Sequence, residues 1–415
     1  MTLNVGAGWS NLRARGPERL AVTLGIFLAG FFLLPSNKAL NNVYYALVLA
    51  PALFLLRGAD WRWLAGSSLW RVAMLLLAYL TLSGLWSANF ELADWLHEAK
   101  GLAYVGVYLA VLACVCARRP QAFERLLQAV VLAAVIGTVM SAALFYVRAP
   151  WTARLYYHGA VYQSVEAATM VGGILLLVLF HCLPAGRGRS GRALWLASAL
   201  ILAAGMVLTG SRMPLAAALG AALLGLGLRR QWRLLGTVLA GVLLIGLAAM
   251  GGEATRQALA RGDSYRLAIW QQFAARVADS PWLGEGLLTD DSTQVAPQGE
   301  DAAPVTILHP HNIFLATALY GGLPALLLLL ALITLALRQG WQLYVRGEPV
   351  WLLCLLFALV CMLTDGDRLL HAPRAIWVYF WLPVGVLIGR QAGNAPADTR
   401  RHHRRLGPLA ANRSE

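Results

Sequence analysis

Residues 194–228 form the stretch LWLASALILAAGMVLTGSRMPLAAALGAALLGLGL, in which two long apolar runs flank the short segment Thr209-Gly210-Ser211-Arg212. Each run approaches the roughly 20 apolar residues that a membrane-spanning helix needs. Arg212 is the only charged residue of the stretch. The stretch therefore predicts two spanning helices joined by a tight loop.

The rest of the chain has a similar composition. Of 415 residues, 59% are apolar and only 13% are charged, whereas a soluble domain carries about 25% charged residues. This balance excludes a soluble globular enzyme. The five cysteines all lie in apolar runs, so neither a disulfide framework nor a cysteine-rich zinc site is expected.

Further apolar runs continue the pattern on both sides of the central pair. They lie near residues 20–35, 40–57, 71–87, 101–117, 126–147, 166–184, 234–251, 312–337, 350–364 and 375–390. We therefore predict an all-α polytopic membrane protein with about twelve transmembrane helices, built as a single integral membrane domain over residues 1–415.

Basic residues concentrate in alternate loops. The two termini and the loops near 57–71, 118–125, 185–193, 228–233 and 337–349 hold 23 of the 34 Lys and Arg residues, but only 6 of the 20 acidic ones. This side carries a net charge of +17 and the other side −3. The positive-inside rule then predicts that both termini are cytoplasmic.

The same distribution explains the basic isoelectric point. The arginines are spread over every inner loop rather than gathered on one face, so no nucleic-acid partner is expected. A basic cluster occurs only in the tail, at residues 400–405, where attraction to anionic membrane lipids is the favoured interpretation.

Residues 252–310 form one long outer loop between the ninth and tenth spans. Its pattern predicts a helix from Tyr265 to Ala278, preceded by capping residues and followed by the turn 280–286. The apolar stripe of this helix consists of Leu267, Ile269, Trp270, Phe273 and Val277. Arg266 projects within that stripe, which is unusual, whereas Arg276 at its edge is expected to extend into water.

Arg212 is the second unusual arginine, because it lies on the outer side. The small residues before it, including Ser211, and Pro214 after it would expose backbone N–H groups at a helix start, a setting that attracts anions. A structural arginine that reaches headgroups or a distant acid is the alternative.

His309-Pro310-His311-Asn312 lies where the long loop enters the tenth span. Asn312 is a suitable N-cap and Pro310 restricts the approach, so an imidazole here is held at a fixed height above the membrane. An imidazole suits proton abstraction from a hydroxyl. Zinc binding and an incidental loop position are the less favoured alternatives.

Asp365-Gly366-Asp367 occupies the last outer loop. Such a pair of carboxylates can ligate a divalent ion in sugar transfer, but a turn with an internal ion pair, for which Gly366 and Arg368 are suited, is favoured. Several aromatic residues of a smaller outer loop are suited either to stacking on sugar rings or, more simply, to an interfacial belt; they are Trp151, Tyr156, Tyr157 and Tyr162.

Taken together, these features resemble the O-antigen ligase family of bacterial inner-membrane glycosyltransferases. The resemblance spans nearly the whole chain. It is carried by the multispan hydropathy, Leu208 to Arg212 after a mid-chain helix, Tyr265-Arg266 at the start of a loop helix, the turn Pro281 to Gly286, and His309 to Asn312.

The resemblance implies transfer of an O-antigen chain from undecaprenyl diphosphate to lipid A-core, with inversion and without nucleotide sugar, cofactor or metal. The active site would face the periplasm. Arg212 and Arg266, with the adjoining Ser211 and Tyr265, would hold the diphosphate. His311 would act on the acceptor hydroxyl, with His309 as the second candidate. A role for Asp365 and Asp367 at the substrate stays open.

Three alternatives share parts of this pattern. A glycan polymerase would use a growing chain as acceptor, and a protein O-oligosaccharyltransferase would use a hydroxyl side chain. A ligase is favoured because the chain has only one large outer loop. A lipid-linked glycan transporter would be expected to place ionisable residues near the bilayer midplane, and the predicted spans have almost none.

Overall fold

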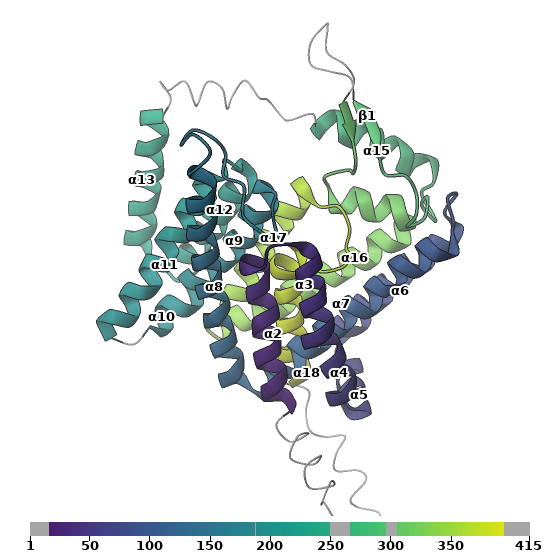
Figure 1. Cartoon of the computed structure of the whole chain (residues 1–415), viewed down its shortest axis with the longest axis horizontal. Coiled ribbons are helices and arrows are strands. Elements are labelled where there is room, and N and C mark those ends of the chain that lie inside the picture. Colours follow the sequence, from purple (N-terminus) through teal and green to yellow (C-terminus); the bar gives the residue numbers. More distant parts are fainter. Residues whose placement is uncertain (1–15, 187, 250–265, 296–304, 394–415) are drawn as a thin grey trace, which may run out of the picture.

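The computed structural model describes residues 16–186, 188–249, 266–295 and 305–393 (Figure 1). The N-terminal half contains α2 (Gly16–Leu33), α3 (Asn37–Tyr44), η1 (Tyr45–Leu49), α4 (Ala50–Leu55), α5 (Gly58–Ala65), α6 (Ser68–Ser83), η2 (Gly84–Trp86), α7 (Leu92–Arg118) and α8 (Pro120–Tyr146). The middle contains α9 (Ser164–Leu177), η3 (Val178–Cys182), α10 (Leu183–Ala185), α11 (Gly188–Leu208), α12 (Arg212–Leu228) and α13 (Trp232–Ala249). The C-terminal part contains α15 (Arg266–Asp279), β1 (Thr293–Val295), β2 (Val305–Ile307), α16 (Ile313–Val345), α17 (Val350–Asp365), η4 (Trp377–Trp381) and α18 (Leu382–Gly393).

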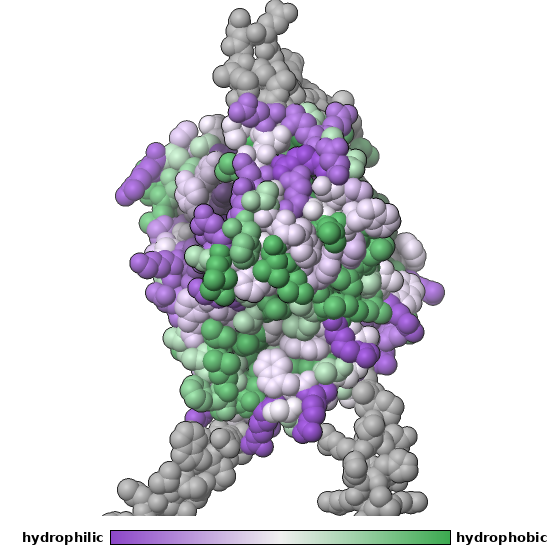
Figure 2. All heavy atoms as spheres, turned by 90° about the vertical axis from the view of Figure 1, so that its right-hand side faces the viewer, coloured by the Kyte–Doolittle hydropathy of each residue, from purple (hydrophilic) through white to green (hydrophobic). Residues whose placement is uncertain are grey.

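The chain is a multi-pass membrane protein. Within the described ranges, eight helical segments are long and apolar enough to cross a membrane, while α12 and α17 are apolar but shorter. Figure 2 shows apolar residues gathered across the middle of one face and hydrophilic residues toward its upper and lower ends. The count of twelve spans stays a prediction.

The helices approach one another closely at small residues, as is typical of membrane bundles. A Cβ added at Gly137 of α8 would lie 2.6 Å from the carbonyl oxygen of Phe32 in α2. At Gly389 of α18, the same atom would lie 2.6 Å from the carbonyl oxygen of Ala113 in α7. The backbones of α2 and α8, and those of α7 and α18, are therefore in close contact at these glycines.

The described chain begins and ends on one face of the bundle. The first residues of α2 and the last residues of α18 lie at the bottom of Figure 1, whereas α15 and β1 lie at the top. We call the top the α15 face and the bottom the opposite face. This arrangement fits the predicted placement of both termini on one side.

A break in α16 docks the α15 region onto the bundle. Gly322 has φ 64° and ψ −162°, and Pro324 follows it inside the helix. Because proline has no N–H, the carbonyl of Tyr320 has no helical donor four residues on, and it accepts instead from Gly286 N at 3.0 Å. Glu285 N donates to the Leu319 carbonyl at 2.7 Å, and Leu323 N donates to Pro281 O at 2.7 Å. The predicted turn 280–286 thus joins the helix through its backbone.

The long loop differs from the prediction in two respects. α15 begins and ends within one residue of the predicted helix, and Ile269 and Phe273 are buried as expected, but Leu267 is 61% exposed. At about 100° per residue, Leu267 lies on the side of the helix opposite Ile269, so it is exposed where Ile269 is buried. The loop also contains an antiparallel pair, with Thr293 opposite Ile307, so it is not purely helical. The strands are too short for their alternation to be recognised in sequence.

Candidate functional site

A cavity of about 730 Å³ opens beside His311 on the α15 face. Its walls come from the segment between α2 and α3, the loop before α9, the start of α9, the segment before α16, and the loop after α17 together with η4; Asp291 of the long loop also lines it. The ionisable residues among its lining are Glu166, Asp291, His309, His311, Asp365, Asp367, Arg368, His371 and Arg374. Tyr162, one of the predicted aromatic candidates, also lines it.

The start of α16 fixes the backbone beside His311. Asn312 is the N-cap, and its side-chain oxygen accepts from Phe314 N at 2.9 Å and from Leu315 N at 3.3 Å. The cap predicted from sequence is therefore confirmed. His311 itself has φ +50°, a left-handed conformation that is uncommon for a residue with a side chain. This turn directs the imidazole away from the helix and into the cavity.

Asp365 orients the His311 ring. The Nδ1 atom of His311 lies 2.8 Å from Oδ1 of Asp365, the last residue of α17. A carboxylate in this position accepts the proton of Nδ1, which leaves the Nε2 lone pair as the free acceptor of the neutral ring. The pair has the geometry of a base held by an orienting group.

Gly366 makes this contact possible. A Cβ added there would lie 2.8 Å from Ile313 Cβ and 3.0 Å from Ile313 N. The end of α17 and the start of α16 therefore meet at a distance that only glycine permits. Sequence alone favoured a turn role for Gly366, and its actual role is to allow this close approach.

His309 packs against the same ring. The centroids of His309 and His311 are 3.9 Å apart, and Nδ1 of His309 accepts from His311 N at 3.4 Å. Burial, and then the neighbouring His311 ring, lower the pKa of His309. With one ring nitrogen committed to the backbone, His309 supports His311 more than it competes with it.

Arg368 is paired with partly buried acids. Its guanidinium lies 3.2 Å from Asp291 and 3.6 Å from Glu98, and Nε donates to the hydroxyl of the buried Tyr320 at 3.2 Å. Tyr320 in turn donates to Asp291 at 2.5 Å. Sequence analysis did not predict these partners of Arg368, because they come from α7, α16 and the long loop.

Asp367 has a different partner from Asp365. It forms an ion pair with Arg374 at 3.0 Å, and it accepts from its neighbour Arg368 N at 2.7 Å. His371 lies on the same loop, where burial and the nearby Arg374 lower its pKa to about 4. The internal ion pair predicted for this loop exists, although it reaches Arg374 instead of Arg368.

The cavity as a whole is not basic. Its lining contains four carboxylates, those of Glu166, Asp291, Asp365 and Asp367, against two guanidinium groups. With neutral histidines the formal charge of the lining is negative. Such a surface suits neutral hydroxyl groups better than a diphosphate.

Arg212 and Ser211 lie at a separate place on the α15 face. Ser211 is the N-cap of α12 and is buried, and Arg212 is exposed at the first position of that helix. Neither residue lines the cavity. Arg154, from the loop before α9, donates to the Thr209 carbonyl at 3.0 Å and to Ser211 Oγ at 3.4 Å. The same loop lines the cavity at residues 159–163, and so it connects the two places.

Arg266 is half-buried at the start of α15 and does not line the cavity. Tyr265 lies outside the described residues. Arg276 contradicts its predicted place in water: it donates to both carboxylate oxygens of Glu285, at 3.0 and 2.5 Å, and to the Asp290 carbonyl at 2.7 Å. Burial raises the pKa of Glu285, but the hydrogen bonds from Arg276 and Thr289 outweigh it and hold that pKa below its usual range.

The side chains in this region do not form a recognisable metal centre. Among the described residues, no group of three or more His, Cys, Asp or Glu side chains has suitable geometry for an ion. Asp365 and Asp367 point to different partners, His311 and Arg374. The Asp-x-Asp pattern therefore serves two local contacts.

Two comparisons with known proteins identify the same family. Residues 197–330 match the family model described as O-antigen ligase, a segment that includes Arg212, Arg266, His309 and His311. The chain is also 31% identical, over 374 residues, to an O-antigen ligase of Pseudomonas aeruginosa, with 87% of each chain covered. The chain belongs to the O-antigen ligase family.

Proposed function

We propose that the protein transfers an O-antigen chain from undecaprenyl diphosphate to a sugar hydroxyl of lipid A-core. The observation that carries this proposal is the His311–Asp365 pair, with its 2.8 Å contact on the wall of the cavity. A single oriented imidazole in a cavity fits a reaction that requires one proton to be removed from a hydroxyl.

The chemistry then needs one displacement. The acceptor hydroxyl gives its proton to Nε2 of His311 while its oxygen forms a bond to the anomeric carbon of the donor sugar. The bond between that carbon and the diphosphate oxygen breaks, and undecaprenyl diphosphate leaves with the electron pair. Because the attack comes from the side opposite the leaving group, the anomeric configuration inverts.

The diphosphate would be held outside the carboxylate-rich cavity. Four acids in the lining of the cavity disfavour a group of high negative charge there. Arg212 at the start of α12 and Arg266 at the start of α15 both lie beyond that lining. Guanidinium groups bind phosphate oxygens in a forked geometry, and helix starts add favourable N–H groups.

The contacts of the two aspartates support a metal-independent reaction. Asp365 is engaged by His311 and Asp367 by Arg374. A divalent ion would have to break both contacts and would leave His311 without its orienting group. We therefore assign the stabilisation of the leaving group to arginine side chains and not to a cation from solution.

The α15 face would be periplasmic in the bacterial inner membrane. The start of α2 and the end of α18 lie on the opposite face (Figure 1). The loops that carry most of the Lys and Arg residues are predicted to lie on the same side as the termini, which the positive-inside rule assigns to the cytoplasm. Undecaprenyl-linked donor and lipid A-core would both reach the cavity from the outer leaflet.

The test is transfer by purified protein from lipid-linked O-antigen to lipid A-core in the absence of nucleotide. We expect product formation that survives EDTA. Loss of product on chelation, restored by Mg²⁺ or Mn²⁺, would contradict the metal-free mechanism. Product formed only with a growing glycan or a peptide as acceptor would contradict the ligase assignment while preserving the site.

A further inference from the structure

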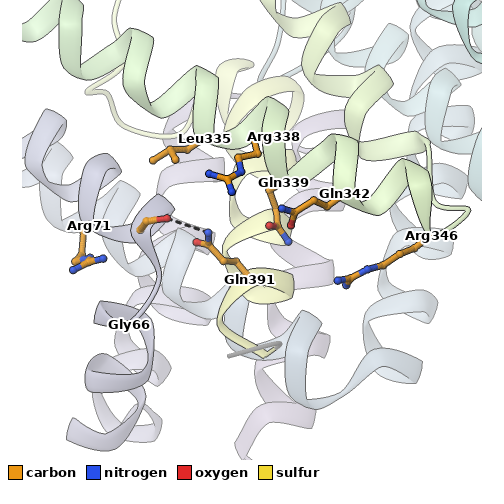
Figure 3. Close-up of a pocket in the computed structure, with 9 residues that line it drawn as sticks. Gly66, Arg71, Leu335, Arg338, Gln339, Gln342, Arg346 and Gln391 are labelled. Atoms are coloured by element: carbon orange, nitrogen blue, oxygen red, sulfur yellow. Dashed lines mark hydrogen bonds between the residues drawn. The ribbon is translucent and has the colours of Figure 1, made fainter. Parts of the chain in front are cut away.

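A second cavity lies on the opposite face of the bundle, and neither His309 nor His311 lines it. It has a volume of about 440 Å³ and lies between the start of α6, the C-terminal part of α16 and the end of α18. Figure 3 shows Arg338 and Arg346 extending from α16 beside Gln391 of α18, with Arg71 on α6 across from them. None of these residues has a role in the proposed transfer.

The charge of this cavity is entirely positive. Its lining includes Arg71, Arg338 and Arg346 and no acidic residue. None of the three arginines forms an ion pair with a residue in the described ranges. The nearby acid Glu348 is already paired with Arg390 at 3.1 Å. Three guanidinium groups therefore line one cavity, and no carboxylate of the described residues neutralises them.

Gln339 places an uncharged amide at the wall of the cavity. This residue is only 5% exposed as a whole, but its side-chain amide lines the cavity and makes no hydrogen bond with the described part of the chain. The amide is therefore available to a group that enters the cavity. Gln391 shows the contrast, because its oxygen accepts from Ser67 Oγ at 2.5 Å and its nitrogen donates to Ser68 Oγ at 3.0 Å.

Aromatic residues of α16 lie among the arginines of the cavity. Trp341 lies on α16 between Arg338 and Arg346 and is 53% exposed, and its ring centroid is 5.0 Å from that of Tyr344. Aromatic side chains of this kind gather at the membrane interface. We therefore expect the cavity to open near the phosphate groups of the adjacent leaflet.

We propose that this cavity binds the phosphate group of an anionic phospholipid, with Arg338 and Arg346 as charge partners and the Gln339 amide as a hydrogen-bond donor. Basic pockets between transmembrane helices on the cytoplasmic side bind such headgroups. This site is independent of the transfer reaction, so either proposal can fail without the other.

The test is titration of the purified full-length protein in neutral detergent with short-chain phosphatidylglycerol, followed by native mass spectrometry. Parallel titrations use short-chain phosphatidylcholine and inorganic phosphate. The double variant Arg338→Gln/Arg346→Gln removes two charges from the cavity. Arg62→Gln/Arg233→Gln is the matched control, because both of its arginines are exposed and lie outside the cavity lining. Gln339→Leu removes the donor without a change of charge.

We expect phosphatidylglycerol to bind more tightly than phosphatidylcholine. Each arginine near an anionic headgroup contributes about fivefold in affinity, so the cavity double variant should lose about 25-fold and the control much less. Gln339→Leu should lose about fivefold. Equal losses in the two double variants, or unchanged binding in Gln339→Leu, would show general surface attraction and overturn the site. Inorganic phosphate that binds as tightly as the lipid would overturn the lipid assignment.

Discussion

His309 and His311 are two residues apart and differ in role because of the backbone between them. His311 has a positive φ and meets Asp365, whereas Nδ1 of His309 accepts a backbone N–H. The cap at Asn312 was predictable, since it depends on adjacent residues. The partner Asp365 was not, because it lies 54 positions away and only the packing of α17 against α16 brings it there. Sequence analysis named Asp365 as one of two carboxylates that can ligate a divalent ion, and not as the partner of His311.

His371 predicts a pH dependence of stability. Its pKa is lowered to about 4 in the folded protein, against roughly 6.5 in an unfolded chain. Between these values the unfolded state binds the extra proton, so the free energy of unfolding falls as the pH drops from about 6.5 toward 4. We expect the free energy of unfolding of His371→Gln to fall by about 1–3 kcal/mol less than that of the unmodified protein over this pH range.

Thermal unfolding in detergent across that pH range measures the effect. His158→Gln is a suitable control, because His158 lies on the same face outside the cavity lining. An unchanged pH slope in His371→Gln would contradict the assignment of the buried neutral histidine.

The junction of α16 and α17 sets the geometry of the site at the scale of elements. A methyl group at position 366 would meet the backbone of Ile313 at 3.0 Å. We expect Gly366→Ala to separate the two helix ends and to reduce transfer at least about tenfold while the protein still folds, since the separation weakens the hydrogen bond that orients the base. Initial transfer rates measure this.

Gly220→Ala in α12 is the control, because nothing lies within 4 Å of the added Cβ. A normal rate in Gly366→Ala would mean that the His311–Asp365 contact is not needed for transfer.

Arg276 illustrates why helical periodicity does not identify the role of a charged residue. The position at the edge of the α15 stripe was correctly inferred, but the turn 280–286 folds back and places Glu285 against it. We expect Arg276→Ala to lower the stability of the α15 region by about 3–5 kcal/mol, because it strands a partly buried carboxylate. Transfer should fall with it.

Hydrogen exchange of residues 266–290 measures that loss directly. Arg148→Ala is the matched charge control, since Arg148 is exposed on the same face. Undiminished protection of α15 in Arg276→Ala would contradict the structural role of the ion pair.

At the scale of the whole molecule, the charge pattern and the position of the cavities separate two faces. The helical class and the membrane segments were predictable because hydropathy acts over whole helices. The break at Gly322 and the pair β1–β2 were not, since each depends on contacts between segments distant in sequence. The cavity at His311 has walls from several such segments, between residues 35 and 379, so no local pattern could define it.

The orientation of these faces gives a further prediction. Gln294 is exposed in β1 on the α15 face. We expect a cysteine introduced by Gln294→Cys to react with a membrane-impermeant maleimide in intact spheroplasts, because the face should be periplasmic. Labelling that appears only after lysis would reverse the orientation and remove the proposed access of both substrates.

The central claim is that His311 and Asp365 act as one unit in proton removal, and a double-mutant cycle on transfer rate tests it most directly. His311→Ala should reduce the rate by about 10² to 10⁴ with donor binding unchanged. Asp365→Asn should also reduce the transfer rate. The double variant should transfer no more slowly than His311→Ala, because the aspartate acts through the histidine. Losses that multiply in the double variant, or near-normal turnover in His311→Ala, would contradict the account.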